Sequence, residues 1–248
     1  MFFQPQVNIS TGRIVGAEAL VRWQDPTNGL VPPSVFIPLA EETSLIIEIG
    51  EWVLRETCRQ GKAWLDAGLP ALTLAVNVSA KQFRHVNMVD VITHILQETG
   101  FPAGQLELEI TESGLMECQD YHTENNATSV QNNSVMMLNN LSALGICLAI
   151  DDFGTGYSSL AYLKHFPLNV LKIDKSFIDE LPYSKDDREI AATIIAMGHN
   201  LGFQVLAEGV ENPQQLAFLQ EKGCDLYQGY FKSAPLSAID FTDLLRKE

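Results

Sequence analysis

Oxygen-bearing side chains follow or interrupt successive apolar runs along this chain, at points far apart in the sequence. They are Glu18, Asn77, Glu109, Asp151, Asp152 and Glu208. The apolar runs, such as Leu106 to Ile110 and Ile146 to Ile150, have the composition of buried strands. In a closed barrel of parallel strands, every strand brings its carboxyl end to the same rim. The spacing therefore predicts a barrel with these side chains gathered on one rim.

The alternation of strand and helix patterns predicts the same architecture. Strands are expected at 2–9, 14–23, 72–78, 106–110, 146–150, 170–173, 205–207 and 225–230. The first two are joined by turn residues at 10–12, which predicts an antiparallel hairpin. Segments between the later strands carry helical periodicity, as at Ile190 and Ile194. We therefore expect an α/β fold, with a barrel favoured over an open sheet.

Composition favours one domain that spans residues 1–248. This length is close to that of a single α/β barrel, and 46% hydrophobic residues are enough for a large core. The 16 Lys and Arg against 31 Asp and Glu leave a net charge of −15, which argues against DNA or RNA polymers as partners. The same negative charge would repel a small anionic ligand unless bound metals and a few placed cations reversed the electrostatic field inside the pocket. Because Met1 leads directly into a strand, we expect the domain to be cut from a longer, multidomain chain.

Signals for export, membrane insertion and zinc binding are missing from the sequence. The cysteines form no CxxC pair, and the chain starts with neither a basic segment nor a long apolar one. They are Cys58, Cys118, Cys147 and Cys224. No apolar run approaches the ~18 residues of a membrane span, and the histidines lack the spacing of zinc ligands. We expect a cytoplasmic domain without membrane contact, while the full-length protein remains open to membrane anchoring.

Several carboxylates on one rim repel each other unless cations lie between them. Hard divalent metals such as Mg²⁺ or Mn²⁺ prefer such oxygen-rich clusters. The adjacent pair Asp151 and Asp152 adds a condition, because successive side chains on a strand point to opposite faces. Both can reach one cluster only if the strand ends there and the backbone turns. Gly154 and Gly156 are expected to supply that turn.

Seven ordered motifs across almost the whole chain resemble those of EAL-domain cyclic di-GMP phosphodiesterases. They are Glu18-Ala19-Leu20, Asn77-Val78-Ser79, Glu107 to Ser113, Asp151 to Leu160, Leu171 to Asp174, Ala207 to Glu211 and Gln228 to Tyr230. The resemblance implies a modified TIM (β/α)8 barrel with one antiparallel strand, in line with the expected hairpin. It also implies metal-dependent hydrolysis of cyclic di-GMP to linear pGpG. Two Mg²⁺ or Mn²⁺ ions about 3.5–4 Å apart suit such a displacement.

The resemblance assigns roles to individual residues. Metal ligands would be Glu18, Asn77, Glu109, Asp151, Asp152 and Glu208, and the catalytic residues would be Lys172, Glu208 and Glu18. Substrate would be held by Gln4, Arg22, Asp174 and Gln228, with Glu112 and Glu211 in support. Lys172 would act on the water as a general base or as a fixed charge. We expect nearby metals to lower its pKa.

Other interpretations remain open at this point. The chain could bind cyclic di-GMP as a sensor without hydrolysing it, although the family's ligands and lysine are all present. A barrel enzyme acting on enolisable acids is disfavoured by the motifs. The resemblance further implies a homodimer, with sensory or cyclase domains outside this chain. We assign no chemistry to the polar stretch at 117–134, expected as a surface loop or a frayed helix start. Phe36, Trp52 and Trp64 are assigned to core packing, with Phe36 also a candidate wall for a guanine.

Overall fold

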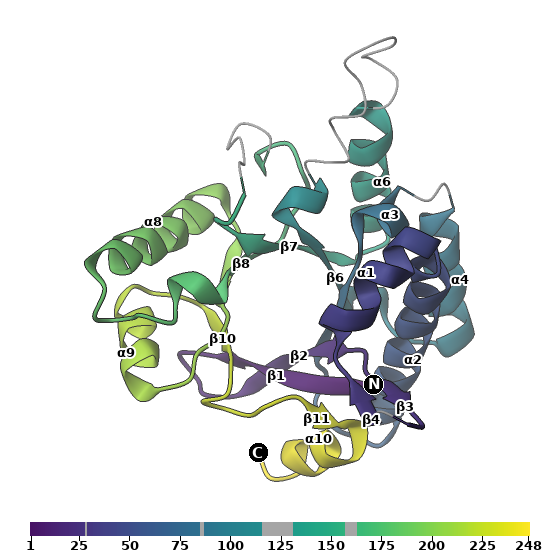
Figure 1. Ribbon diagram of the computed structural model, residues 1–248, viewed down its shortest axis with the longest axis horizontal. Coiled ribbons are helices and arrows are strands. Elements are labelled where there is room, and N and C mark those ends of the chain that lie inside the picture. The colour runs from purple at the N-terminus through teal and green to yellow at the C-terminus, as the bar shows by residue number, and fades with distance from the viewer. Residues whose placement is uncertain (28, 85–86, 116–130, 157–162) are drawn as a thin grey trace.

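The computed structural model describes residues 1–27, 29–84, 87–115, 131–156 and 163–248. Its centre is a closed barrel, visible as the ring of strands in Figure 1. The barrel strands, in spatial order, are β1 (Phe2–Asn8), β2 (Ile14–Leu20), β5 (Thr73–Asn77), β6 (Leu106–Thr111), β7 (Cys147–Phe153), β8 (Val170–Ile173), β9 (Gln204–Ala207) and β10 (Leu226–Gln228). β1 pairs antiparallel with both β2 and β10, and the other neighbours are parallel. The predicted modified TIM barrel with one antiparallel strand is confirmed.

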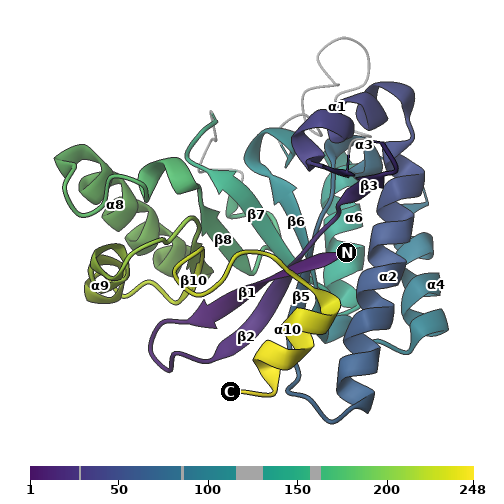
Figure 2. The same ribbon diagram turned by 60° about the horizontal axis from the view of Figure 1, so that its bottom comes forward.

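Helices surround the ring. They are α1 (Pro33–Thr43), α2 (Ile46–Asp66), α3 (Ala80–Phe83), α4 (Met88–Thr99), α6 (Gln131–Ala143), α8 (Lys185–Leu201), α9 (Pro213–Glu221) and α10 (Ala238–Leu245), with short 3₁₀ turns η1 (Ala103–Gln105) and η2 (Lys175–Phe177). In the turned view of Figure 2, α2, α4 and α6 lie on one side of the strands and α8 and α9 on the other. The main core fills the space between strands and helices.

Two short additions were not expected from the sequence. β3 (Trp23–Asp25) and β4 (Gly29–Val31) form a separate antiparallel pair. The second barrel strand therefore ends at Leu20, and Trp23 belongs to another sheet. β11 (Leu236–Ser237) pairs with the start of β1. These additions lie outside the motif residues and leave the barrel order unchanged.

The expected core role holds for two of the three aromatic residues. Phe36 and Trp64 are buried, and the Trp64 indole nitrogen donates to Thr242 Oγ1 at 2.8 Å. The prediction is wrong for Trp52, whose side chain is 47% exposed. The buried face of α2 runs through Val53 and Leu54, and Trp52 lies off that face.

Some predicted features lie outside the described residues. These are residues 117–130 of the polar stretch, Cys118 within it, and Tyr157 to Leu160 of the aspartate-rich motif. Residues 131–134 belong to α6. Across the described ranges, no helix is both long and apolar enough to cross a lipid bilayer.

Candidate active site

The inside of the barrel has two layers, and the candidate site is the polar one. The lower layer is a small apolar cluster, separate from the main core. It comprises Ala149, Val170, Leu206 and Leu226. Two residues further along the chain, on the same face of each strand, stand Asp151, Lys172, Glu208 and Gln228. The apolar layer lies beneath the polar groups, which face the carboxyl rim of the parallel strands.

Lys172 lies at the centre of the polar layer and is fully buried. Its Nζ is 2.7 Å from Glu208 Oε1, 2.9 Å from Glu109 Oε1 and 3.1 Å from Asp151 Oδ1. These distances are those of ion pairs, but among the described residues Lys172 Nζ and both Glu109 oxygens have no partner in hydrogen-bond geometry. We therefore describe the contacts as charge pairs. A buried ammonium is tolerated here because carboxylates surround it.

Glu18, on β2, is held at both carboxylate oxygens. Asn77 Nδ2 donates to Oε1 at 2.6 Å, and Gln228 Nε2 donates to Oε2. The same Gln228 nitrogen lies 3.1 Å from Gln4 Oε1. Because Asn77 uses its amide nitrogen in this contact, its amide oxygen is the atom left for a cation. Side chains from two strands distant in sequence, β5 and β10, thus fix the carboxylate of Glu18.

The turn that brings both aspartates to the cluster lies at Asp152 itself. Asp152 has φ +53°, a left-handed conformation that is rare outside glycine. The β7–β8 register shifts between Ile150 and Phe153, and β7 continues to Phe153. The expected mechanism was therefore wrong in detail, because a β-bulge turns the backbone while the strand goes on. Gly154, at φ +99°, follows the bulge and does not create it.

The residues present fit a divalent metal site. One carboxylate oxygen from each of Asp151, Asp152 and Glu208 lies within 4.8 Å of the others. Both oxygens of Glu109 are buried without a hydrogen bond in the described structure. Such unsatisfied, hard oxygen donors are suited to a cation that prefers oxygen ligands. The acidic cluster expected from the sequence is present.

Burial and mutual repulsion oppose ionisation of these carboxyl groups. Burial is the largest cause that raises the pKa of Glu208 to about 8, against an ordinary value of 4.5, while Lys172 lowers it. Burial likewise places the pKa of Glu109 well above its ordinary value. The pKa of Asp152 is raised by burial and then by the charges of Asp151 and Asp174. A bound cation would favour the ionised forms.

The pKa of Lys172 is set by its burial and by the carboxylates around it. Burial lowers it, as expected for an ammonium out of water, but neighbouring carboxylates outweigh burial. They are Asp151, Glu109, Glu208 and Glu18. These carboxylates place the pKa of Lys172 well above its ordinary value, while the expected lowering by bound metals stays a prediction. Both roles considered for Lys172, general base and fixed charge, stay predictions.

Glu112, on the chain after β6, lies under the loop that follows β7. Its Oε2 accepts from the backbone nitrogen of Gly154 at 2.8 Å. A Cβ on Gly156 would come within 2.9 Å of Glu112 Oε1, so the loop packs closely on this carboxylate. Glu112 is buried, and its location is that of a loop support.

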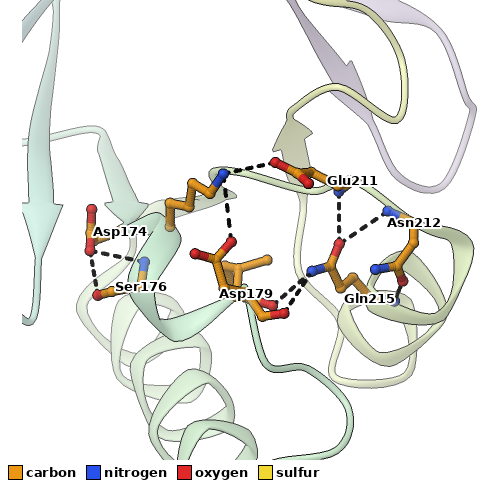
Figure 3. A network of polar contacts seen from close by, with 8 residues as sticks. Asp174, Ser176, Asp179, Glu211, Asn212 and Gln215 are labelled. Atoms are coloured by element: carbon orange, nitrogen blue, oxygen red, sulfur yellow. Dashed lines mark hydrogen bonds and ion pairs between the residues drawn. The ribbon is translucent and has the colours of Figure 1, made fainter.

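Glu211, after β9, belongs to a polar network that joins two loops of the rim (Figure 3). Its carboxylate pairs with Lys175 Nζ at 2.7 Å, and its backbone nitrogen donates to Gln215 Oε1 at 2.7 Å. Asp174 accepts from the backbone nitrogen and hydroxyl of Ser176 and caps η2. The network fixes the loop after β8 against the start of α9.

A cavity of about 290 Å³ opens beside the polar layer. Its lining includes Gln4, Glu18, Asp151, Lys175, Glu208, Glu211, Gln228 and Tyr230. Arg22 is not among its lining residues. The guanidinium donates to the Val21 carbonyl at 2.8 Å, lies 5.6 Å from the centre of the Phe2 ring, and lines a different hollow with Trp23 and Phe36. Gln4 uses its nitrogen on the Ser233 carbonyl.

Comparison with known proteins decides the family. Residues 1–235 match the EAL domain as a family. The chain belongs to the EAL domain family. It is 44% identical over 238 residues to "Bifunctional diguanylate cyclase/cyclic di-GMP phosphodiesterase MucR" of Pseudomonas aeruginosa, covering 96% of this chain and 33% of that protein. It is 45% identical over 246 residues to "Cyclic di-GMP phosphodiesterase NbdA" of the same organism, covering 99% and 30%.

A solved structure supports the same assignment. "PaMucR Phosphodiesterase, c-di-GMP complex" superimposes with a TM-score of 0.87 at 43% identity, covering 97% of this chain and 92% of that one. This EAL domain spans about a third of the length of the two curated relatives named above, which are larger proteins.

Two residues at the cavity of this EAL domain were missed in the sequence. Lys175 directly follows Asp174, the last residue of the fifth motif, and Tyr230 ends the seventh. Their positions at the end of a motif, or directly after one, were the available signal. A lysine in a turn is usually interpreted as a solvated surface charge. Only the structure shows that Lys175 reaches the cavity.

Proposed function

We propose that this EAL domain hydrolyses one phosphodiester of cyclic di-GMP to give linear pGpG, with two Mg²⁺ or Mn²⁺ ions. The observation that carries the proposal is the group of buried carboxylates around Lys172, beside an open cavity at the carboxyl rim. Relatives named as cyclic di-GMP phosphodiesterases support the choice of substrate.

Six side chains would hold the cations: Glu18, Asn77, Glu109, Asp151, Asp152 and Glu208. When bound, the ions lower the pKa of water and neutralise the phosphoryl oxygens during in-line displacement. The chain contributes the positions of the ligands. Asn77 and Gln228 orient Glu18, and the bulge at Asp152 brings two successive carboxylates to one cluster.

Lys172 would act as a fixed positive charge next to the attacking water. The carboxyl groups around Lys172 favour its charged form, and contacts with Glu109, Asp151 and Glu208 hold its ammonium in place. A preorganised charge in a dry site stabilises developing negative charge more strongly than a solvated one. Glu18 and Glu208 would complete the catalytic set through their ligand positions.

Substrate would be held around the cavity. Gln4 and Gln228 line the cavity directly. Asp174 is the first residue after β8, at the start of the loop that carries Lys175. Arg22 would need to leave Phe2 and the Val21 carbonyl to reach a phosphate. A second hollow of about 630 Å³ includes Asn77 and shares Leu20 with the first, so the two hollows are neighbours. Glu112 and Glu211 would support the loops.

The test is incubation with cyclic di-GMP and Mg²⁺ or Mn²⁺, followed by chromatographic separation of pGpG. We expect turnover by the wild type and by Lys185→Met, which removes an exposed charge on α8. Glu18→Ala and Lys172→Ala should lose at least about a hundredfold in rate. Tight binding without pGpG would support the sensor instead. Full turnover by Glu18→Ala would contradict the metal assignment.

The cellular setting is a further part of the proposal. By resemblance, the domain would work in the cytoplasm as a homodimer, fused to sensory or cyclase domains in a longer chain. The length of the curated relatives agrees with such an arrangement. Size-exclusion chromatography with light scattering, with and without cyclic di-GMP, would test the dimer.

A further inference from the structure

The cavity beside the site is strongly acidic, although the proposed substrate is an anion. Its lining includes Glu18, Asp151, Glu208 and Glu211. Bound cations would neutralise the carboxylates of the cluster but leave Glu211 in place. Among the described residues that line the cavity, Lys175 is the one basic side chain. Any phosphate that enters on this side therefore meets Lys175 first as a source of positive charge.

Lys175 has a rigid base. It is the first residue of η2, directly after the Asp174 cap. Gly209, at φ +70°, packs against its stem, because a Cβ there would lie 2.3 Å from Lys175 Cγ. Gln215, almost fully buried, donates to the Ile178 carbonyl at 3.0 Å and ties η2 to α9 (Figure 3). The Cα of Lys175 is therefore fixed next to the loop that carries Glu208.

The ammonium of Lys175, in contrast, is held weakly. It pairs with Glu211 at 2.7 Å and with Asp179 at 3.7 Å. The Lys175 side chain is 48% exposed and that of Glu211 44%. Exposed pairs of this kind contribute only about 0–1 kcal/mol. The long stem of lysine lets the ammonium exchange one partner for another at little cost.

The placement of Arg22 leaves Lys175 as the basic side chain on this side. Arg22 lies over Phe2 and lines the hollow with Trp23 and Phe36, not the cavity of Glu208. Lys172 is enclosed by carboxylates and cannot turn toward the cavity mouth. Lys175 is therefore the basic side chain that can pair with a phosphodiester oxygen at the mouth of this cavity.

We propose that Lys175 is a substrate-binding residue of this site: its ammonium leaves Glu211 and pairs with a phosphodiester oxygen of the bound cyclic dinucleotide. The inference rests on the proposed function for the identity of the ligand. Glu211 then competes with substrate for the ammonium and sets the affinity. No covalent step is involved.

The test is steady-state kinetics of four variants with cyclic di-GMP and Mg²⁺. Lys175→Met should raise KM about tenfold and change kcat less than about twofold, because the lost pair contributes to binding. Lys175→Arg should restore KM to within about threefold. Glu211→Gln should lower KM, since it removes the competitor while leaving the ammonium. Lys185→Met, the matched loss of a distant charge, should leave both parameters unchanged.

Two outcomes would overturn the proposal. If Lys175→Met and Glu211→Gln raise KM equally, the pair only joins two loops. If Lys175→Met lowers kcat and leaves KM unchanged, Lys175 acts through Glu208 and does not bind substrate. Failure of the wild type to form pGpG would instead contradict the proposed function. In that case calorimetric titration of the same variants with cyclic di-GMP decides the role of Lys175, by a tenfold loss of affinity or its absence in Lys175→Met.

Discussion

Asp152 combines two demands on one residue. Its carboxyl joins the acidic cluster, and its backbone adopts φ +53°. A left-handed conformation costs an ordinary L-residue about 1–2 kcal/mol, but Asn and Asp tolerate it better, and glycine adopts it freely. The strain is placed where the bulge is needed, which is consistent with a functional site.

Three substitutions at Asp152 separate these demands. All remove the carboxylate, so we expect all to lose metal-dependent turnover. Their stabilities should differ only through the backbone. The most stable should be Asp152→Gly, followed by Asp152→Asn and then Asp152→Ala. The melting temperature of Asp152→Ala should be about 2–4 °C lower than that of Asp152→Asn. Thermal unfolding in EDTA measures this order, and equal melting temperatures would show that φ at this position is not strained in solution.

Lys172 neutralises the polar layer as well as serving the proposed chemistry. Replacing it by Met leaves Glu109, Asp151 and Glu208 facing each other without a cation. Loss of one partner from a buried ion pair costs about 3–5 kcal/mol. We expect Lys172→Met to lower stability by that amount in EDTA and to regain part of it with Mn²⁺. Chemical denaturation measures both. Stability equal to that of Lys185→Met would contradict the central role of this charge.

At the scale of elements, Gln215 joins the loop after β8 to the loop after β9. Its Oε1 accepts from the backbone nitrogens of Glu211 and Asn212, and its Nε2 donates to the carbonyls of Ile178 and Asp179 (Figure 3). Both loops carry residues of the candidate site. One buried amide thus fixes the relative position of two segments that the barrel itself connects only through β8 and β9.

Gln215→Ala should therefore destabilise the domain although it touches no proposed ligand. The change leaves buried backbone groups without partners, at a cost of about 2 kcal/mol, or about 4–8 °C in melting temperature. Gln214→Ala, one residue earlier on the exposed side of α9, is the matched control and should melt like the wild type. A Gln215→Ala protein with unchanged melting temperature would mean that water replaces the amide.

The limits of sequence-based prediction follow from these elements. The strands were predictable because buried runs such as Leu106 to Ile110 are apolar on one face and functional on the other. The bulge at Asp152 was not, because no local composition distinguishes a turning strand from an ending one. The positions of the Arg22 and Lys175 side chains could not be predicted from the sequence either. Long side chains choose partners by tertiary contacts, and both residues stand in similar motif contexts.

At the scale of the whole molecule, the polar groups of the candidate site lower the stability of the barrel interior. The apolar layer of Ala149, Val170, Leu206 and Leu226 packs like a core. The polar layer above it keeps buried carboxyl groups whose ionisation the fold resists. The net charge of −15 adds general repulsion to this local penalty. Cation binding would relieve both, so the domain as a whole is expected to be more stable in its metal-bound form.

This balance predicts the pH dependence of stability. The pKa of Glu208 is about 8 in the folded protein, against an ordinary value of 4.5. Between these values the folded state holds a proton that the unfolded state releases, so the free energy of unfolding falls as pH rises. We expect the melting temperature in EDTA to decrease from pH 5 to pH 8. Because ligands bind cations in their deprotonated form, the stabilisation by Mn²⁺ should grow over the same range.

Glu208→Gln isolates the contribution of this site from that of surface charges and histidines. The variant removes the titrating group, so its melting temperature in EDTA should fall less steeply with pH than that of the wild type. Measurements at high salt screen the surface and leave the buried group acting. Identical slopes for the two proteins would mean that Glu208 titrates normally. The polar layer would then be open to water, and burial would not be what opposes the ionisation of its carboxyl groups.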